Sequence, residues 1–412
     1  MALLVLKFGG TSVGDIDRIK HVGTIVKREV EAGHRVIVVV SAMSGVTNQL
    51  LDYCQQMNTL ISDEARAESD HVASAGEQIT SGLLALHLQT TGLQSRAWTG
   101  WQLPLRSDGM YSKARIDAIA TDALLESVNA GCVAVIAGFQ GISPEGCITT
   151  LGRGGSDTSA VAIAAAVKAD RCDIYTDVDG VYTCDPRIVK RARKLNKVSY
   201  EEMLEMASLG SKVLQPRSVE VAMNYRVPVV VRSTFEDIPG TLVTDEEDDM
   251  EQQRVTGLAY SRDEARITLV NVENKPGVSA AIFGPLADRG INVDMIVQNV
   301  TEDGRSTDLT FTVSKGDLAR ALEIVNGASG MPKFEKSHTD SGVAKISVIG
   351  VGMRSHAGVA AEMFRTLAEK NINIIVISTS EIKISVLIDE SYIELALRAL
   401  HTAYGLDAAE EK

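Results

Sequence analysis

Two glycine-rich segments in the first half of the chain combine residue types that bind phosphate and carboxylate groups. Lys7–Ser12 reads KFGGTS, and Gly152–Ala160 reads GRGGSDTSA. Adjacent glycines let the backbone approach a phosphate closely with its N–H groups, and Lys7 can place a point charge on a phosphoryl group in transfer. Arg153 suits bidentate binding of a carboxylate, while Asp157 can orient an ammonium group, bind through a metal or align reacting groups. Because Lys7 precedes the glycines, the first segment is not the GxxxxGK[ST] P-loop.

Both segments also have a purely structural interpretation. KFGG alone fits a plain turn between a strand and a helix. In the second segment, Ser156, Asp157 or Thr158 can cap the helix that follows. A cap needs one such residue, and not Arg153, two adjacent glycines, Ser156 and Asp157 together. The second segment is therefore the more specific signal.

A third segment, Tyr175–Arg187 (YTDVDGVYTCDPR), places two carboxylates at the end of a predicted strand. Asp177 and Asp179 are two residues apart, so a turn can direct both at one ligand. Arg187 is suitably placed for a nucleotide phosphate. A solvated loop is the alternative interpretation.

A fourth segment, His71–Ser81 (HVASAGEQITS), carries one candidate for binding a substrate ammonium group. Glu77 follows Gly76 at the predicted start of a helix. There its carboxylate either complements the helix dipole or accepts hydrogen bonds from a substrate ammonium. His71 is more typical of a surface or capping residue than of a base or ligand.

The elements that must position these residues alternate along the first half of the chain. Apolar and β-branched runs predict strands, and apolar residues at helical spacing predict helices. The alternation indicates a layered α/β domain with a mostly parallel sheet, in which ligands bind at the carboxyl ends of the strands. The predicted strands are Ala2–Phe8, Arg35–Val40, Cys132–Phe139 and Cys172–Thr176, and the predicted helices are Arg18–Ala32, Gln78–Gln89 and Ser159–Ala169.

The second half of the chain contains an internal duplication at a constant offset of 81 residues. Gly277 aligns with Gly358, and Asn292 aligns with Asn373. Each copy predicts the order strand, helix, strand, strand, helix, which is consistent with two small ferredoxin-like modules. A run in which six of the seven residues 245–251 are acidic precedes them. Such a run cannot enter a core without a large desolvation cost, so it predicts a linker.

Length and composition exclude several classes of protein. The 412 residues predict two or three domains, and 45% hydrophobic residues suffice for buried cores. Lys plus Arg is 41 and Asp plus Glu is 54, a net charge of −13 that disfavours a nucleic-acid binder. No apolar run approaches the ~18 residues of a membrane span. Five cysteines at irregular spacing, without a CxxC pair, indicate reduced thiols rather than disulfides or a cysteine-rich zinc site.

Motifs along nearly the whole chain occur in an order that resembles the aspartokinases. They are KFGGTSV, VVVSAMSGVTN, the Gly76–Glu77 pair, GRGGSDT, TDVDGVYTCDPR, GSKVLQPRS, NKPGV, GINVDMI and STSEIKISVLI. The resemblance implies an α/β fold: an amino-acid-kinase-like three-layer αβα domain with a mostly parallel sheet, plus two ferredoxin-like (βαββαβ) ACT modules. It places the catalytic domain at residues 1–244, an acidic linker at 245–263, and the ACT modules at 264–340 and 341–412.

Aspartokinases transfer the γ-phosphoryl group of ATP to the β-carboxylate of L-aspartate, giving 4-phospho-L-aspartate. The resemblance implies that Lys7 contacts the ATP phosphates and that Asp157 organises this lysine. It further implies that Arg153 binds the α-carboxylate of aspartate and Glu77 its ammonium. Mg²⁺ is expected on the ATP phosphates rather than on protein ligands, and Asp179 receives no catalytic role. Ser41, Thr47 and Ser156 would complete the substrate pocket, and the nucleotide site would comprise Lys7, Phe8, Gly9, Gly10, Thr176, Asp177, Tyr182, Arg187, Lys212 and Val213.

The ACT modules imply feedback inhibition by lysine, threonine or both, with the effectors bound between ACT modules. The implied effector residues are Ser279, Asn292, Asp294, Gln298 and Asn299 in the first module, and Val359, Asn373 and Ile374 in the second. The resemblance also implies a cytoplasmic homo-oligomer paired through its ACT modules, without nucleic-acid or membrane partners. A second subunit that starts internally near Met250 is a further hypothesis.

Two other functions stay open beside this interpretation. One is a related kinase of the same fold that acts on glutamate, acetylglutamate or UMP. The other is a non-catalytic amino-acid sensor in which the kinase half serves as a scaffold. A dinucleotide-dependent oxidoreductase is disfavoured, because no GxGxxG follows the first strand.

Overall fold

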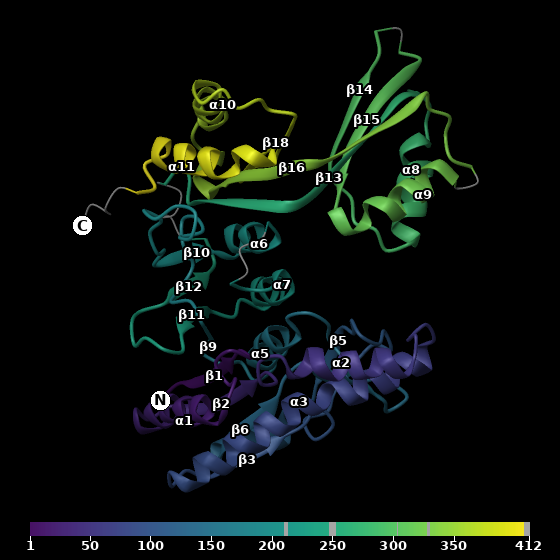
Figure 1. Ribbon diagram of the computed structural model, residues 1–412. Coiled ribbons are helices and arrows are strands. Elements are labelled where there is room, and N and C mark those ends of the chain that lie inside the picture. Colours follow the sequence, from purple (N-terminus) through teal and green to yellow (C-terminus); the bar gives the residue numbers. More distant parts are fainter. Residues whose placement is uncertain (210–212, 247–252, 303, 328–329, 408–412) are drawn as a thin grey trace. The chain divides into compact units, whose positions relative to one another are not determined.

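The computed structural model describes residues 1–209, 213–246, 253–302, 304–327 and 330–407 (Figure 1). It divides into two compact units. The first comprises Met1–Val181, Lys194–Ser208 and Lys212–Glu247, and the second comprises Tyr182–Arg193, Leu209–Ser211 and Asp248–Lys412. Tyr182–Arg193 thus belongs to the second unit although it lies within the predicted catalytic domain. Met250, the hypothetical internal start, and most of the acidic run lie outside the described residues.

An eight-stranded sheet forms the centre of the first unit, and it is mostly parallel, as expected. Of its neighbouring strands, only β11 and β12 run antiparallel. In spatial order the strands are β10 (Lys197–Ser199), β12 (Thr241–Thr244), β11 (Val229–Ser233), β9 (Arg171–Thr176), β1 (Leu3–Phe8), β2 (Arg35–Val40), β6 (Val133–Ala137) and β3 (Ser95–Trp98).

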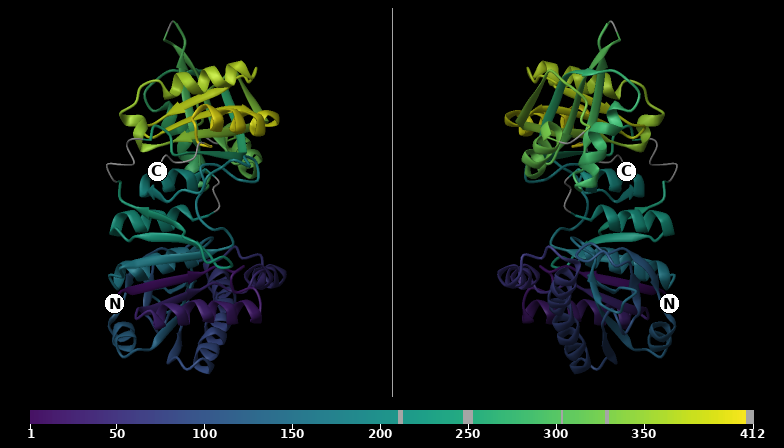
Figure 2. Two further views of the ribbon diagram at one scale, coloured as in Figure 1. Left: turned by 90° about the vertical axis from the view of Figure 1, so that its left-hand side faces the viewer. Right: turned by 90° about the vertical axis from the view of Figure 1, so that its right-hand side faces the viewer.

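Helices cover both faces of this sheet (Figures 1 and 2). Successive side chains of a strand point to opposite faces of the sheet. In β1 this alternation places apolar core residues on one face and a charged candidate site residue on the other. Leu4, Leu6 and Phe8 pack with apolar residues of α1 and α3, while Lys7 points to the α5 face and meets Asp157. The helices of this unit are α1 (Ile16–Glu31), α2 (Val46–Met57), α3 (Asp63–Thr90), α4 (Asp122–Asn129), α5 (Gly155–Ala166), α6 (Tyr200–Ser208) and α7 (Pro216–Tyr225).

The predicted elements of this unit are confirmed, with shifts at their ends. The helix predicted from Gln78 begins at Asp63, and the helix predicted from Ser159 begins at Gly155. A second, four-stranded sheet was not predicted, because strands of three or four residues are too short to show a period. Its order is β5 (Ile116–Ile119), β4 (Leu105–Ser107), β7 (Gln140–Ile142) and β8 (Ile148–Thr150).

The second unit contains the predicted duplication as one six-stranded antiparallel sheet. Two long strands, β13 and β16, pair with each other and join the two modules. β13 begins at Gly257, within the stretch predicted as linker. The spatial order is β14 (Asp294–Val300), β15 (Ser306–Val313), β13 (Gly257–Glu273), β16 (Lys336–Ile349), β18 (Lys383–Asp389) and β17 (Val376–Thr379).

Two helices per module pack against this sheet and close a separate core in each module. The core of the second module also takes in Cys184 and Val189 from the Tyr182–Arg193 segment. No helix within the described residues has the length and apolarity to cross a membrane. The helices are α8 (Val278–Asp288) and α9 (Leu318–Gly327) in the first module, and α10 (Val359–Glu369) and α11 (Ile393–Ala403) in the second.

Candidate functional site

Lys7 and Asp157 form a buried ion pair at the carboxyl edge of the eight-stranded sheet. The Nζ atom of Lys7 lies 2.5 Å from Oδ1 of Asp157, and the two side chains are only 9% and 11% exposed. Because little water surrounds the pair, its attraction is stronger than that of a surface pair. A Cβ on Gly9 would lie 3.4 Å from the Nζ of Lys7, so the ammonium sits directly against the glycine backbone. The pair therefore holds the Lys7 ammonium in a fixed position at the KFGG turn.

The loop before α5 depends on two glycines with left-handed backbone. Gly152 has φ +76° and Gly154 has φ +71°, and a Cβ on Gly154 would come within 1.8 Å of the Gln215 side chain. The structure does not support the alternative interpretation of this segment as a side-chain cap: the N-cap residue is Gly154, and the helix has no side-chain cap hydrogen bond from a described residue. The Gly155 N–H donates to the Gly152 carbonyl at 2.9 Å and the Asp157 N–H to the Gly154 carbonyl at 3.1 Å, which leaves the Ser156 N–H of the first turn for an anion. The helix itself contains all three residues named in that alternative, Ser156, Asp157 and Thr158.

Glu77 lies in the middle of α3, not at the start of a helix as predicted. The absence of a side chain at Gly76 lets α3 come close to Ala42, because a Cβ at this position would lie only 2.7 Å from the Cβ of Ala42. The helix therefore approaches the end of β2 closely, and one carboxylate oxygen of Glu77 accepts the Ala42 N–H at 3.0 Å. The other oxygen is buried and has no hydrogen-bond partner. Burial raises the pKa of Glu77 to about 7, against the lowering effect of the Ala42 hydrogen bond.

The other predicted substrate residues surround the same edge of the sheet. Ser41 follows β2 directly, and its N–H donates to the Phe8 carbonyl at 3.1 Å. Thr47 lies in the first turn of α2. Arg153 is exposed and makes no hydrogen bond or ion pair within the described part of the chain. Its guanidinium is therefore available to a ligand.

A corner after β6 also belongs to this edge, and sequence reasoning missed it. The Gly138 N–H donates to the Val40 carbonyl at 3.0 Å, and a Cβ on Gly138 would lie 3.0 Å from the Cβ of Ser156. The next N–H, of Phe139, donates to the Ser159 hydroxyl at 3.1 Å. A glycine directly after a buried strand was the available signal.

The predicted nucleotide residues fall into several groups. Thr176 ends β9, and its hydroxyl donates to the Asp177 carboxylate at 3.2 Å. Asp179, which received no catalytic role, pairs with Lys194 at 3.2 Å. The ring of Phe8 is buried and stacks on Tyr175, with 4.7 Å between ring centroids. Only the backbone of Phe8 is thus available to a ligand.

The remaining nucleotide candidates lie elsewhere. Tyr182 and Arg187 belong to the second unit, where Arg187 pairs with Asp185 at 2.8 Å. Lys212 lies outside the described residues, and Val213 is the first residue after that gap. Among the described residues, no group of three or more His, Cys, Asp and Glu side chains is arranged to hold a metal ion.

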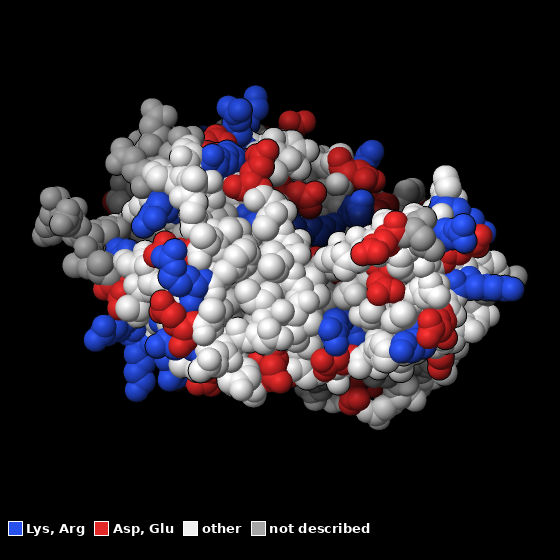
Figure 3. Space-filling model, turned by 90° about the horizontal axis from the view of Figure 1, so that it is seen from above, with Lys and Arg blue, Asp and Glu red and all other residues white. Residues whose placement is uncertain are grey.

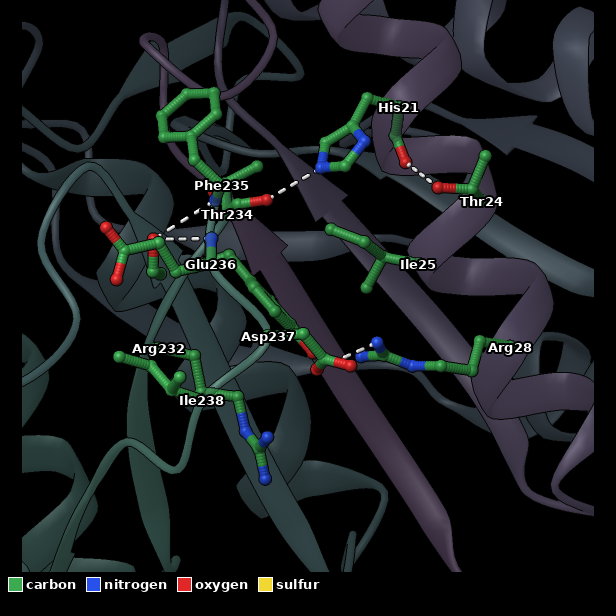
Figure 4. Close-up of a pocket in the computed structure, with 12 residues that line it drawn as sticks. His21, Thr24, Ile25, Arg28, Arg232, Thr234, Phe235, Glu236, Asp237 and Ile238 are labelled. Carbon is green, nitrogen blue, oxygen red and sulfur yellow. Dashed lines mark hydrogen bonds and ion pairs between the residues drawn. The ribbon is translucent and has the colours of Figure 1, made fainter.

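A cavity of about 320 Å³ lies on the α1 side of the sheet, apart from these residues (Figure 4). His21 Nε2 lies 2.8 Å from the Thr234 carbonyl, and Arg28 pairs with Asp237 at 2.9 Å across the cavity. None of the predicted substrate or nucleotide residues lines it. The Lys7–Asp157 pair is therefore not part of this cavity.

The predicted effector residues lie at both ends of the first helix of each module and, in the first module, also along β14. In the first module, Ser279 is exposed in the first turn of α8, and Asn292 lies between α8 and β14. In the second, Asn373 and Ile374 lie between α10 and β17. Val359 is buried at 3% exposed, so only its backbone is available.

Three further effector candidates, Asp294, Gln298 and Asn299, lie on β14. The carboxylate of Asp294 is paired with Lys345 of β16. Lys345 is itself 5% exposed and also lies 2.9 Å from Glu264. Asp294 is thus tied to the strand that joins the two modules.

Three family models match the chain. Residues 2–233 match the amino acid kinase family, and residues 266–330 and 346–404 each match an ACT domain. Curated relatives include an aspartokinase of Pseudomonas aeruginosa, 53% identical over 410 residues, and an aspartate kinase of Stutzerimonas stutzeri, 52% identical over 409 residues. In both comparisons the alignment covers 99% of this chain and 98% of the relative.

The solved structures that resemble this chain also include aspartokinases. The crystal structure of Escherichia coli aspartokinase III in complex with aspartate and ADP superposes with a TM-score of 0.79 at 29% identity. Its complex with lysine and aspartate superposes with a TM-score of 0.76 at 28% identity. Each comparison covers 97% of this chain and 99% of the other.

Proposed function

This chain belongs to the aspartokinase family, and from that membership we propose that it transfers the ATP γ-phosphoryl group to the β-carboxylate of L-aspartate. The product is 4-phospho-L-aspartate. Lysine, threonine or both inhibit the reaction through the ACT modules.

The buried Lys7–Asp157 pair is the observation that carries this proposal. A fixed ammonium against the Gly9 backbone suits the charge that develops on a phosphoryl group in transfer. The N-terminus of α5, where the Ser156 N–H has no backbone acceptor among the described residues, also favours an anion. Asp157 holds the lysine in position and does not itself need to react.

The acceptor side of the reaction is supported by Glu77 and Arg153. The unpartnered oxygen of Glu77 is a buried acceptor without a donor, and a buried acceptor gains most from a charged N–H group. The ammonium of aspartate supplies one. The exposed guanidinium of Arg153 then binds the α-carboxylate, which leaves the β-carboxylate as the nucleophile.

The nucleophile needs no general base. The β-carboxylate of aspartate is already deprotonated at neutral pH, so catalysis consists of positioning and electrostatic stabilisation. Mg²⁺ bound to the ATP phosphates supplies further neutralisation of charge.

Effector binding is assigned to the first turn of α8, the α8–β14 loop and β14 in the first module, and to the start of α10 and the α10–β17 loop in the second. Escherichia coli aspartokinase III, a relative, has been solved with lysine. An effector that binds one state of the enzyme selectively needs a coupling of only ~1–3 kcal/mol for substantial inhibition.

Pairing of two chains through their ACT modules is part of the proposal. Three large apolar side chains on the outer strands are exposed: Ile296 at 53%, Val300 at 55% and Ile377 at 44%. The face drawn in Figure 3 carries a broad uncharged surface with charged side chains around it. Exposed apolar side chains such as these three are typical of protein interfaces. A second subunit from Met250 stays a prediction.

The test is an ATP- and Mg²⁺-dependent hydroxamate assay with L-aspartate, run with lysine, threonine and both. The expected result is hydroxamate formation that falls with added effector. Activity without inhibition would contradict the regulatory part alone. Product with glutamate or acetylglutamate but not with aspartate would move the chain to a related kinase. Lysine or threonine binding without turnover of any acceptor would favour the sensor.

A further inference from the structure

The backbone before the Arg153 loop is held by a buried carboxylate that sequence reasoning did not single out. Asp70 of α3 is 1% exposed. One of its oxygens accepts the N–H groups of Thr150 at 2.7 Å and Ser112 at 2.8 Å. The other accepts the hydroxyls of the same two residues, at 2.8 Å and 3.3 Å. All four partners are neutral donors, and two of them come from the last residue of β8.

Arg217 of α7 holds the next residue of the chain from the other side. Its Nη1 donates to the Leu151 carbonyl at 2.9 Å, and its Nη2 donates to the Ala114 carbonyl at 2.7 Å. The N–H of Ala114 in turn donates to the Thr150 carbonyl at 2.9 Å. A planar guanidinium bound to two carbonyls fixes both segments in one orientation.

The loop that follows is packed from the same helix. Gln215, the N-cap residue of α7, leaves no room for a Cβ on Gly154. The residue between the fixed positions, Arg153, is the exposed tip of the loop. Its backbone is therefore set by Thr150 and Leu151 on one side and by Gly154 on the other.

We propose that Asp70 and Arg217 are positioning residues for substrate aspartate, which act by holding the backbone that aims Arg153 at the α-carboxylate. The inference rests on the proposed function, because it takes Arg153 as the α-carboxylate ligand. Neither residue touches the substrate. Both act through the loop that carries Arg153. Replacing either residue therefore displaces the contact between Arg153 and the α-carboxylate but does not remove the guanidinium.

The chemistry of the Asp70 contacts predicts which substitutions matter. Alanine leaves two buried N–H groups without an acceptor. Asparagine has the same shape: its carbonyl takes over the two N–H groups, and its NH₂ donates to the two hydroxyls, which can rotate to accept. Asp70→Asn is therefore the conservative variant that keeps hydrogen bonds to all four partners of Asp70.

The experiment compares steady-state kinetics of Asp70→Ala, Asp70→Asn and Arg217→Met. Asp70→Ala and Arg217→Met are expected to raise KM for aspartate about tenfold or more, since small misplacements of a binding group weaken it strongly. KM for ATP should stay within about twofold, and Asp70→Asn should restore most of the affinity. Asp63→Ala, on the exposed first turn of the same helix, is the matched control. Arg217→Met carries the test if Asp70→Ala does not fold.

A double-mutant cycle with Arg153→Ala separates positioning from general destabilisation. Arg153→Ala alone should raise KM for aspartate roughly 10- to 100-fold, as expected for loss of a charged hydrogen bond. In that background, Asp70→Ala and Arg217→Met should have almost no further effect on KM, because the group that they aim is gone. Equal effects in both backgrounds, or an unchanged KM in the single variants, would overturn the inference.

The outcomes also separate this inference from the proposed function. A wild-type enzyme that does not phosphorylate aspartate, or an Arg153→Ala variant with unchanged KM, would contradict the proposed function. A wild-type enzyme that phosphorylates aspartate while both positioning variants keep its KM would overturn only the positioning role.

Discussion

Glu77 combines a buried carboxylate with one oxygen that has no partner. Its raised pKa of about 7 follows from burial, which disfavours the charged form. A bound ammonium would favour the ionised form again. Substrate affinity and ionisation of this side chain are therefore linked.

We expect KM for aspartate to rise about tenfold between pH 8 and pH 6, because only ionised Glu77 holds the ammonium and a group of pKa about 7 is mostly protonated at pH 6. Initial rates over a series of aspartate concentrations at each pH measure this. Glu77→Gln should have a high KM that no longer varies across this range. A pH-dependent KM in Glu77→Gln that matches the wild type would contradict the assignment.

For single residues, the sequence identified which side chains carry the chemistry better than it predicted where they lie within helices and strands. The motifs around Lys7 and Asp157 led to both residues, because glycines beside a charge are informative in themselves. Glu77 was placed at a helix start, although it lies mid-helix. A local pattern cannot show that a helix continues for several turns before a glycine. Asp70 and Gly138 were missed because their partners are distant in sequence.

Among the helices and strands, α3 is the one whose packing against the end of β2 positions the predicted ammonium ligand of the substrate pocket. It approaches the end of β2 at Gly76, where a Cβ would lie 2.7 Å from the Cβ of Ala42. The same approach brings Glu77 to the Ala42 N–H. A glycine inside a helix costs ~1 kcal/mol relative to alanine, so a close contact explains its presence here.

Gly76→Ala should destabilise the protein by ~1–3 kcal/mol, as overpacking does, and raise KM for aspartate. Chemical denaturation and steady-state kinetics measure the two effects. Gly82→Ala, six residues later in the same helix, is the matched control. A Cβ at Gly82 meets no atom within 4 Å, so that variant should gain about 0.5–1 kcal/mol. An equal gain in Gly76→Ala would show that the helix does not depend on the close approach.

Sequence patterns are sufficient to predict the bounds of some strands of the protein but not of others. Strands such as Arg35–Val40 were predicted with their observed ends, because a β-branched run in a buried parallel sheet is unambiguous. The four-stranded sheet was missed because its strands are short. The pairing of β13 with β16, through which the two copies share one sheet, was also not predicted, because no pattern within one copy shows which strand of the other copy it pairs with.

For the whole molecule, the assignment of Tyr182–Arg193 to the second unit matters most. Its Cys184 and Val189 enter the core of the second ACT module. The hydroxyl of Thr183 lies 2.9 Å from Nε2 of His401, which is 1% exposed on α11. A segment that carries two predicted nucleotide residues is thus built into the regulatory unit, which no pattern in one stretch of sequence could reveal.

His401 makes the stability of this unit depend on pH. Burial lowers the pKa of His401 below its ordinary value, so the folded state disfavours the protonated ring. The resulting stabilisation is present above the unfolded pKa of about 6.5 and is lost as the pH falls through the folded pKa. Unfolding free energy should therefore drop by up to about 1.4 kcal/mol per pH unit just below pH 6.5.

Calorimetry between pH 7.5 and pH 5 measures this drop. His401→Gln keeps a polar side chain near Thr183 but cannot titrate, so its curve should be flatter than that of the wild type. His338→Gln, at an exposed position of β16, is the control and should retain the wild-type slope. Identical slopes in His401→Gln and wild type would contradict the role of His401.

Replacing Lys7 tests the central claim most directly, because phosphoryl transfer at this edge depends on its fixed charge. Lys7→Ala should lower kcat for aspartate phosphorylation by roughly 10²–10³-fold, the usual effect of removing one group that stabilises a transition state. KM for aspartate should change little, and the fold should be retained. Lys20→Ala, an exposed lysine of α1 paired with Asp17, should behave as the wild type. A folded Lys7→Ala variant that turns over as fast as the wild type would contradict the account.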